Sequence, residues 1–173
     1  MSIALIDQRL VSWPPDAEAF SRLLEPLLGQ AYRLAAVMLN DRAAAEDAVQ
    51  EASVKAWRKL RQLRGDATSL RPWFLSIVAN ECRMARRARW WSVLKVGDIR
   101  DARPQDREPE TDLHQALLRL SPDERLPLVL HFYLDLPLEE LARTLGVGPS
   151  AAKSRVYRAV KRLRADLTME EVF

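Results

Sequence analysis

Six cations gather between Ala152 and Ala165, with no acidic residue among them: Lys153, Arg155, Arg158, Lys161, Arg162 and Arg164. Lysine and arginine bind phosphate groups, and arginine can also bind a base edge through two parallel hydrogen bonds. A second basic segment, residues 61–100, holds nine basic and three acidic residues, whereas residues 101–124 hold three and seven. Two basic segments separated by an acidic one indicate a polyanionic partner, which the net charge of +3 alone does not reveal.

Other chemistry is poorly supported by the residue types. The two histidines, His114 and His131, are far apart and have no ligand-type neighbours at metal-binding spacing. No phosphate-binding glycine loop or nucleophile motif is present, and Cys82 is expected to be a small buried residue. We therefore predict no enzyme activity, metal, cofactor or small-molecule substrate. No signal peptide or apolar run long enough to cross a membrane is found, so a cytoplasmic protein without membrane insertion is expected.

Apolar periodicity places the basic segments on helices and predicts an all-α chain. Helices are expected over residues 23–38, from 43 to about 63, and from near Pro72, with Asn40-Asp41 as a break and cap. The apolar stripe expected on the second helix consists of Ala44, Ala48, Val49, Ala52, Ala56, Trp57 and Leu60.

Helical periodicity disappears between Ser92 and Thr111, where Gly97, Pro104 and Pro109 accompany mixed charge. This composition is typical of a linker. We predict two small helical domains joined by a flexible linker, the C-terminal one a helix-turn-helix. The expected divisions are an N-terminal lead-in (1–17), the first domain (18–91), the linker (92–111), the second domain (112–168) and a tail (169–173).

Residues 137–167 have the pattern of a helix-turn-helix motif. Pro137 opens a short helix with an acidic first turn, Gly146 permits a left-handed turn, and Pro149 begins a second helix. At about 100° per residue, one sector of that helix holds Ala152, Val156, Ala159, Val160, Leu163 and Leu167. The opposite sector holds Ser150, Ser154, Tyr157, Arg158 and Lys161, with Lys153, Arg155 and Arg162 on its flanks. This arrangement suits a helix in the major groove of DNA; a basic amphipathic helix in a bundle is the alternative.

With these features in the observed order, about residues 20–168 resemble the extracytoplasmic-function (ECF) sigma factors, the minimal two-domain class of the large sigma family. The resemblance implies a factor that binds core RNA polymerase, recognises the minus-thirty-five and minus-ten promoter elements, and initiates transcription of a stress or signal regulon. The implied partners are the β′ coiled coil and β subunit of the polymerase, promoter DNA, and an anti-sigma factor.

Residues 41–60, DRAAAEDAVQEASVKAWRKL, resemble the family's helix that docks on the β′ coiled coil. The resemblance implies that Asp47, Gln50 and Glu51 bind the core polymerase. Val54 can share their face, because the four positions are spaced i, i+3, i+4 and i+7. Taken without the other motifs, these acids would be interpreted as a solvated surface.

Residues 71–90, RPWFLSIVANECRMARRARW, resemble the family's promoter-melting helix, with Trp73, Ile77, Ala79 and Asn80 at matching positions. The resemblance implies that this helix and the loop before it, about residues 63–70, recognise the minus-ten element and capture a flipped base. The residues assigned to minus-ten DNA are Arg71, Asn80, Arg83, Arg86 and Arg87. Trp73 is expected to belong mainly to the core.

Residues 152–164, AKSRVYRAVKRLR, resemble the family's minus-thirty-five reading helix. The residues assigned to that element are Ser150, Lys153, Ser154, Arg155, Tyr157, Arg158 and Lys161. The family's linker threads through the polymerase cleft, and its acidic end here could partly mimic RNA charge; a plain tether is the alternative. Two other functions stay open at this point: a conventional helix-turn-helix regulator, and a sigma-like decoy that sequesters an anti-sigma protein.

Overall fold

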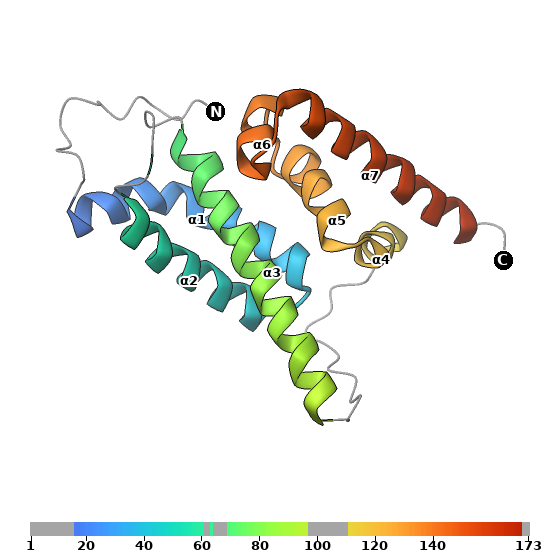
Figure 1. The fold of residues 1–173 in the computed structure, drawn as a ribbon, viewed down its shortest axis with the longest axis horizontal. Helices are drawn as coiled ribbons and strands as arrows, with labels where there is room; N and C mark the ends of the chain where they lie inside the picture. Colours follow the sequence, from blue (N-terminus) through green and yellow to red (C-terminus); the bar gives the residue numbers. More distant parts are fainter. Residues whose placement is uncertain (1–15, 61–62, 64–68, 97–110, 171–173) are drawn as a thin grey trace.

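The computed structural model describes residues 16–60, 63, 69–96 and 111–170, and within these ranges the ordered elements are all helical. The predicted all-α fold is therefore confirmed. In chain order the elements are α1 (Ala17–Leu39), α2 (Arg42–Lys59), α3 (Leu70–Val96), α4 (Asp112–Arg119), α5 (Pro122–Leu128), the π-helix η3 (Val129–Tyr133), α6 (Leu138–Leu145) and α7 (Pro149–Glu170) (Figure 1). None of the helices in these ranges is long and apolar enough to cross a membrane.

Helices α1, α2 and α3 form the N-terminal unit. Helix α1 ends where Asn40 takes a left-handed conformation (φ 51°), and α2 begins at once because the Asp41 side chain accepts a hydrogen bond from the Ala44 N–H. The expected break and cap are therefore confirmed. The face of α2 that packs on α1 and α3 consists largely of alanine, which lets the three helices approach closely. Its buried residues are Ala45, Ala48, Val49, Ala52 and Ala56.

Trp57 does not belong to that buried stripe, contrary to the sequence prediction. Its side chain is 42% exposed and packs on Phe20 of α1, with the two ring centroids 5.3 Å apart. The indole lies at the edge of the stripe, where the small residues of α2 leave no room for it between helices. Helix α3 also continues to Val96, past the boundary expected at residue 91, so the first part of the predicted linker is helical. The other linker residues, 97–110, lie outside the described residues, as do the lead-in 1–15, the loop residues 64–68 and the tail from 171.

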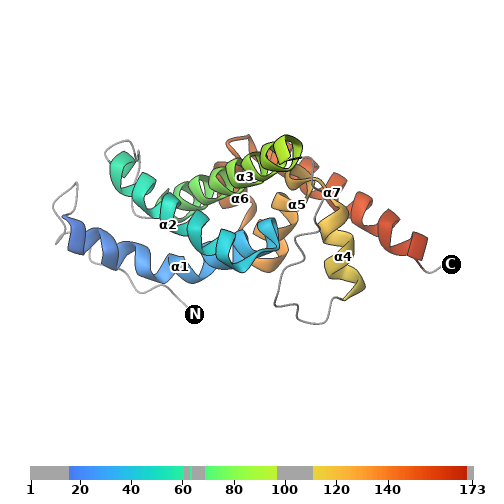
Figure 2. The same cartoon turned by 90° about the horizontal axis from the view of Figure 1, so that it is seen from below.

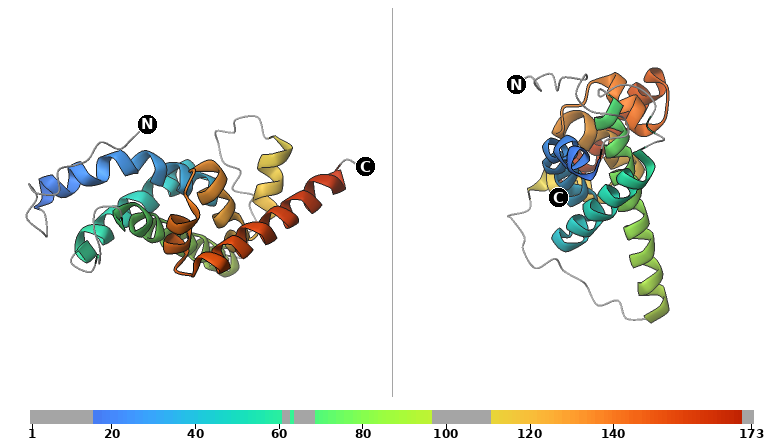
Figure 3. Two further views of the ribbon diagram at one scale, coloured as in Figure 1. Left: turned by 90° about the horizontal axis from the view of Figure 1, so that it is seen from above. Right: turned by 90° about the vertical axis from the view of Figure 1, so that its left-hand side faces the viewer.

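Helices α4 to α7 and η3 form the C-terminal unit. A capping box starts α5, because Ser121 accepts a hydrogen bond from the Glu124 N–H and the Glu124 carboxylate accepts one from the Ser121 N–H. Gly146 adopts the left-handed conformation (φ 64°) at the end of α6, and its turn directs α7 across the unit. Figures 2 and 3 show α7 extending away from the N-terminal helices.

The two units pack on each other, which the sequence did not predict. One hydrophobic cluster runs from Phe74 and Val78 of α3 to Leu130, Leu141 and Ala142 of the C-terminal unit. Helix α3 lies against α6, and α1 contacts α5 and η3. The N-terminal and C-terminal units therefore share a core in the free chain rather than being connected through residues 92–111 alone.

Candidate nucleic-acid and polymerase interfaces

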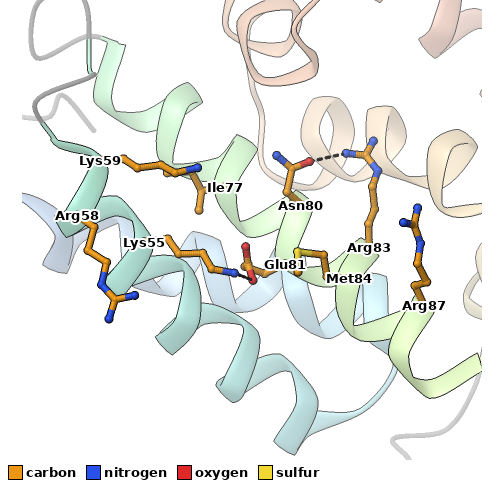
Figure 4. A pocket seen from close by; sticks show the side chains of 9 residues that line it. All are labelled: Lys55, Arg58, Lys59, Ile77, Asn80, Glu81, Arg83, Met84 and Arg87. Carbon is orange, nitrogen blue, oxygen red and sulfur yellow. Dashed lines mark hydrogen bonds and ion pairs between the residues drawn. The ribbon is translucent and has the colours of Figure 1, made fainter. Parts of the chain in front are cut away.

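A groove of about 590 Å³ lies between the C-terminal half of α2 and the middle of α3 (Figure 4). The α2 side contributes three cations, and the α3 side contributes an amide, two arginines, one carboxylate and two apolar side chains. The lining residues are Lys55, Arg58, Lys59, Ile77, Asn80, Glu81, Arg83, Met84 and Arg87. Side chains from two helices therefore converge on one strongly basic surface.

The charge of the groove is dominated by cations. The one carboxylate, Glu81, is 9% exposed and pairs with Lys55 (Nζ to Oε2, 2.5 Å), so these two charges largely cancel. Arg58, Lys59 and Arg87 carry their charges on exposed side chains. Met84, which is 58% exposed, adds an apolar surface beside them. Cations beside an apolar surface are the combination that binds unpaired strands, with phosphates on the cations and a base against the apolar part.

The structure gathers Asn80, Arg83 and Arg87, three of the residues assigned to minus-ten DNA, in this groove. Arg83 Nη1 donates a hydrogen bond to Asn80 Oδ1 (3.2 Å). Arg86 is exposed, but its guanidinium donates to the Met38 carbonyl of α1 (3.5 Å), and Arg86 does not line the groove. Arg71 is separate as well, since it binds residues of α1, α6 and the segment before α6.

Sequence reasoning missed the α2 side of the groove. Lys55, Arg58 and Lys59 are spaced i, i+3 and i+4, which places them on neighbouring positions of one helix surface. That spacing was visible in the sequence. Their proximity to Asn80 and Arg87 depends on how α2 packs against α3, so the groove itself was not.

The residues assigned to polymerase binding lie along the middle of α2. Asp47, Gln50 and Glu51 are exposed, and Val54 is 45% exposed beside them. The opposite face of this segment is buried and consists largely of alanine. The exposed surface of α2 thus changes from acidic in its middle to basic at its end, where Arg58 and Lys59 also complement the helix dipole.

Helix α7 has the two faces that the helical wheel predicts. Ala152 and Ala159 are buried, and Val156, Val160 and Leu163 are half-buried against the unit. Of the residues assigned to the minus-thirty-five element, Arg155 is half-buried and the others, Ser150, Lys153, Ser154, Tyr157, Arg158 and Lys161, are exposed. Tyr157 is 71% exposed, which is unusual for an aromatic side chain in a folded unit. Local bonds orient the face, because Ser154 Oγ donates to the Ser150 carbonyl (3.0 Å) and Arg158 Nε to the Ser154 carbonyl (3.4 Å).

These observations describe a helical protein with a basic groove and an exposed helix-turn-helix, and comparisons with known proteins define its family. The profile of Sigma-70 region 2 matches residues 21–92, and that of Sigma-70, region 4 matches residues 110–163. The chain is 31% identical over 145 residues to the RNA polymerase sigma factor SigV of Bacillus subtilis, covering 82% of this chain and 86% of that protein. It is 31% identical over 151 residues to the ECF RNA polymerase sigma factor SigM of Mycobacterium tuberculosis, covering 86% and 76%.

A solved structure has a similar fold: the sigma factor RpoE in complex with the anti-sigma factor NepR from Bartonella quintana. It superimposes with a TM-score of 0.69 at 26% identity, covering 87% of this chain and 98% of that one. The chain belongs to the ECF sigma factors of the sigma-70 family. It binds RNA polymerase and promoter elements, and like the rest of its family it is a transcription initiation factor and not an enzyme. The region 2 match covers the segment that a conventional helix-turn-helix regulator leaves unexplained.

Proposed function

We propose that three separate surfaces of this sigma factor divide the work of initiation. The α2–α3 groove binds the minus-ten element, and the exposed face of α7 binds the minus-thirty-five element. The acidic face of α2, formed by Asp47, Gln50, Glu51 and Val54, binds the β′ coiled coil of the polymerase. The observation that carries the proposal is the groove, where Asn80, Arg83 and Arg87 converge with three cations of α2.

The minus-ten assignment follows from the chemistry of the groove. Melting a promoter exposes unpaired bases, and holding them requires both phosphate binding and a surface for the base. Arg58, Lys59 and Arg87 supply exposed cations, while Asn80 offers a donor and an acceptor for a base edge. Because the Asn80 carbonyl oxygen accepts from Arg83, its amide N–H₂ is directed away from that bond. The loop before α3, which shares this role by resemblance, lies largely outside the described residues.

The other two surfaces are supported by exposure and charge. The face formed by Asp47, Gln50 and Glu51 is acidic and open to a basic partner helix. The face of α7 presents hydroxyl groups, Tyr157 and Arg158 between lysines, which is the mixture that reads base edges and binds phosphates in a major groove. Docking of the C-terminal unit on the polymerase β subunit would set the distance between α7 and the α2–α3 groove.

An anti-sigma factor is proposed as a further partner, supported by the similarity to RpoE, which was solved with NepR. The sigma factor itself would act in the cytoplasm, where polymerase and promoter DNA are found. A protein that covers the acidic face of α2 or the α2–α3 groove would block binding to the polymerase or to minus-ten DNA.

Run-off transcription with purified core polymerase tests the proposal. The wild-type chain should give a promoter-specific transcript, and Arg58→Ala/Lys59→Ala should reduce it while leaving core binding intact. Arg22→Ala, an exposed arginine of α1 away from the groove, is the control and should have no effect. Core binding without any transcript would favour the decoy function. A transcript unaffected by the α2 substitutions would show that Arg58 and Lys59 do not belong to the DNA site.

A further inference from the structure

Among the described residues that line the α2–α3 groove, Glu81 is the one carboxylate, and its side chain is only 10% exposed. Its Oε2 accepts a hydrogen bond from Lys55 Nζ of α2 (2.5 Å). None of the described residues donates a hydrogen bond to the other oxygen, Oε1. Figure 4 shows the carboxylate directed towards the Lys55 ammonium, with Met84 beside it on the same helix. The groove therefore contains an enclosed, charged acceptor with one oxygen still available.

A carboxylate is unexpected in a surface that binds phosphates, because like charges repel. The pairing of Glu81 with Lys55 also neutralises one of the cations that α2 contributes. An enclosed ion pair adds little net stability, since the loss of hydration offsets most of the attraction between its charges. Neither phosphate binding nor stability therefore accounts for the acid, whereas contact with a base of the bound strand does.

The hydrogen-bonding groups beside Glu81 define the base edge that fits. The Asn80 amide N–H₂ can donate, because the Asn80 carbonyl oxygen already accepts from Arg83 (3.2 Å). An acceptor from Glu81 next to a donor from Asn80 matches a base that has an amino group beside a ring acceptor, as cytosine and adenine do. Thymine has a carbonyl oxygen in place of the amino group, and that oxygen would face the carboxylate.

We propose that Glu81 is a specificity-determining residue, which accepts a hydrogen bond from the exocyclic amino group of an unpaired minus-ten base. Lys55 fixes the carboxylate through Oε2 and leaves Oε1 as the oxygen that the base contacts. Met84, which is 58% exposed, supplies an apolar surface against which the ring can lie. This role of Glu81 rests on the proposed binding of minus-ten DNA by the α2–α3 groove.

Two single strands of about 20 nucleotides test for the amino group: oligodeoxycytidine and oligodeoxyuridine. Their bases have the same size and differ along one edge, where cytosine has the amino group and uracil a carbonyl oxygen. The binding of fluorescently labelled strands is measured for holoenzyme reconstituted from the full chain and core polymerase, with core polymerase alone as the background. We expect the wild-type holoenzyme to bind the cytidine strand about five- to twentyfold more tightly than the uridine strand.

Glu81→Gln keeps the size of the side chain but adds a donor that can pair with the uracil carbonyl. We expect the preference for the cytidine strand to fall below about twofold. If Glu81 only held α2 against α3, the substitution would change the affinity for both strands by the same factor and leave the preference intact. Glu25→Gln, which removes the same charge from an exposed position of α1, is the matched control and should keep the wild-type preference. Circular dichroism and gel filtration check folding and holoenzyme formation.

Arg87→Ala separates the role of Glu81 from that of the groove. Arg87 is an exposed groove cation, so its loss should weaken the binding of both strands by about three- to tenfold. If it does, but the wild type shows no preference or Glu81→Gln retains it, Glu81 does not read the base and the groove assignment stands. If Arg87→Ala leaves the binding of both strands unchanged, the groove assignment fails and the role of Glu81 fails with it. The wild-type preference is measured without any substitution, so it decides the matter where a variant does not fold.

Discussion

Replacing Arg125 by methionine removes a buried guanidinium that joins both units, and we expect the folded chain to lose about 2–4 kcal/mol of stability. The side chain is 1% exposed, and none of the described acids pairs with it. Its partners are five backbone carbonyls, those of Leu117 (2.7 Å), Leu118 (2.7 Å), Leu120 (3.0 Å), Val37 (3.2 Å) and Met38 (3.3 Å). Val37 and Met38 lie in the last turn of α1, and Leu117, Leu118 and Leu120 lie at the end of α4, where most carbonyls lack a helical donor. Leu117 also accepts from the Leu120 N–H (3.3 Å).

The magnitude follows from the acceptors left behind. The bond to Leu120 is fully buried, and an unsatisfied buried acceptor costs about 1–3 kcal/mol; the Met38 carbonyl, also buried, would keep only its long bond from Arg86 (3.5 Å). The remaining carbonyls are partly accessible and can bind water instead. Burial also lowers the pKa of Arg125 to about 10, so removing the charge recovers part of its desolvation cost. One buried acceptor left unsatisfied, the weakened contact at Met38 and the charged hydrogen bonds exchanged for water together give a loss of about 2–4 kcal/mol.

Urea denaturation followed by circular dichroism measures this loss. Arg125→Lys keeps the charge but has only three donors, so we expect an intermediate stability. Arg143→Met, at an exposed position on α6, is the control and should stay within about 0.5 kcal/mol of the wild type. A stability of Arg125→Met within about 1 kcal/mol of the wild type would refute the argument that these carbonyls depend on it.

Three further predictions concern the surfaces and the core. Asp47→Lys should weaken binding to core polymerase about tenfold, measured by surface plasmon resonance, because it reverses a charge facing a basic partner; Glu25→Lys, an exposed acid of α1, should not. Arg158→Ala should weaken recognition of the minus-thirty-five element by about 1–3 kcal/mol in promoter-binding assays, and an equal loss on templates lacking that element would contradict the assigned register. Burial raises the pKa of the Cys82 thiol to about 12, so between pH 7 and 9 a thiol reagent should modify it only as fast as the chain unfolds; rapid labelling of the native protein would show that the site is open.

Much of the local architecture was available from the sequence, because it depends on contacts within a few residues. The cap at Asp41 and the left-handed turn at Gly146 both lie where their residue types predicted them. The two faces of α7 follow from helical periodicity, which requires only that the segment be a helix with one side buried. Residues 47–54 on α2 were likewise expected on one face.

What the tertiary structure decided is which of these elements meet. The groove exists because α2 packs beside α3, and Glu140 and Asp123 of the C-terminal unit pair with two arginines of α3 that are far away in the chain. Nothing in the spacing of Arg71 or Arg125 distinguishes them from exposed arginines, yet both are largely enclosed by partners from several helices. Periodicity and capping are read over one or two helical turns, whereas burial of a charged side chain depends on backbone carbonyls and carboxylates brought together by the shared core. The sequence by itself therefore determined the helices and their charged faces, and only the packing of the two units decided which arginines stay exposed and which are already bound within the chain.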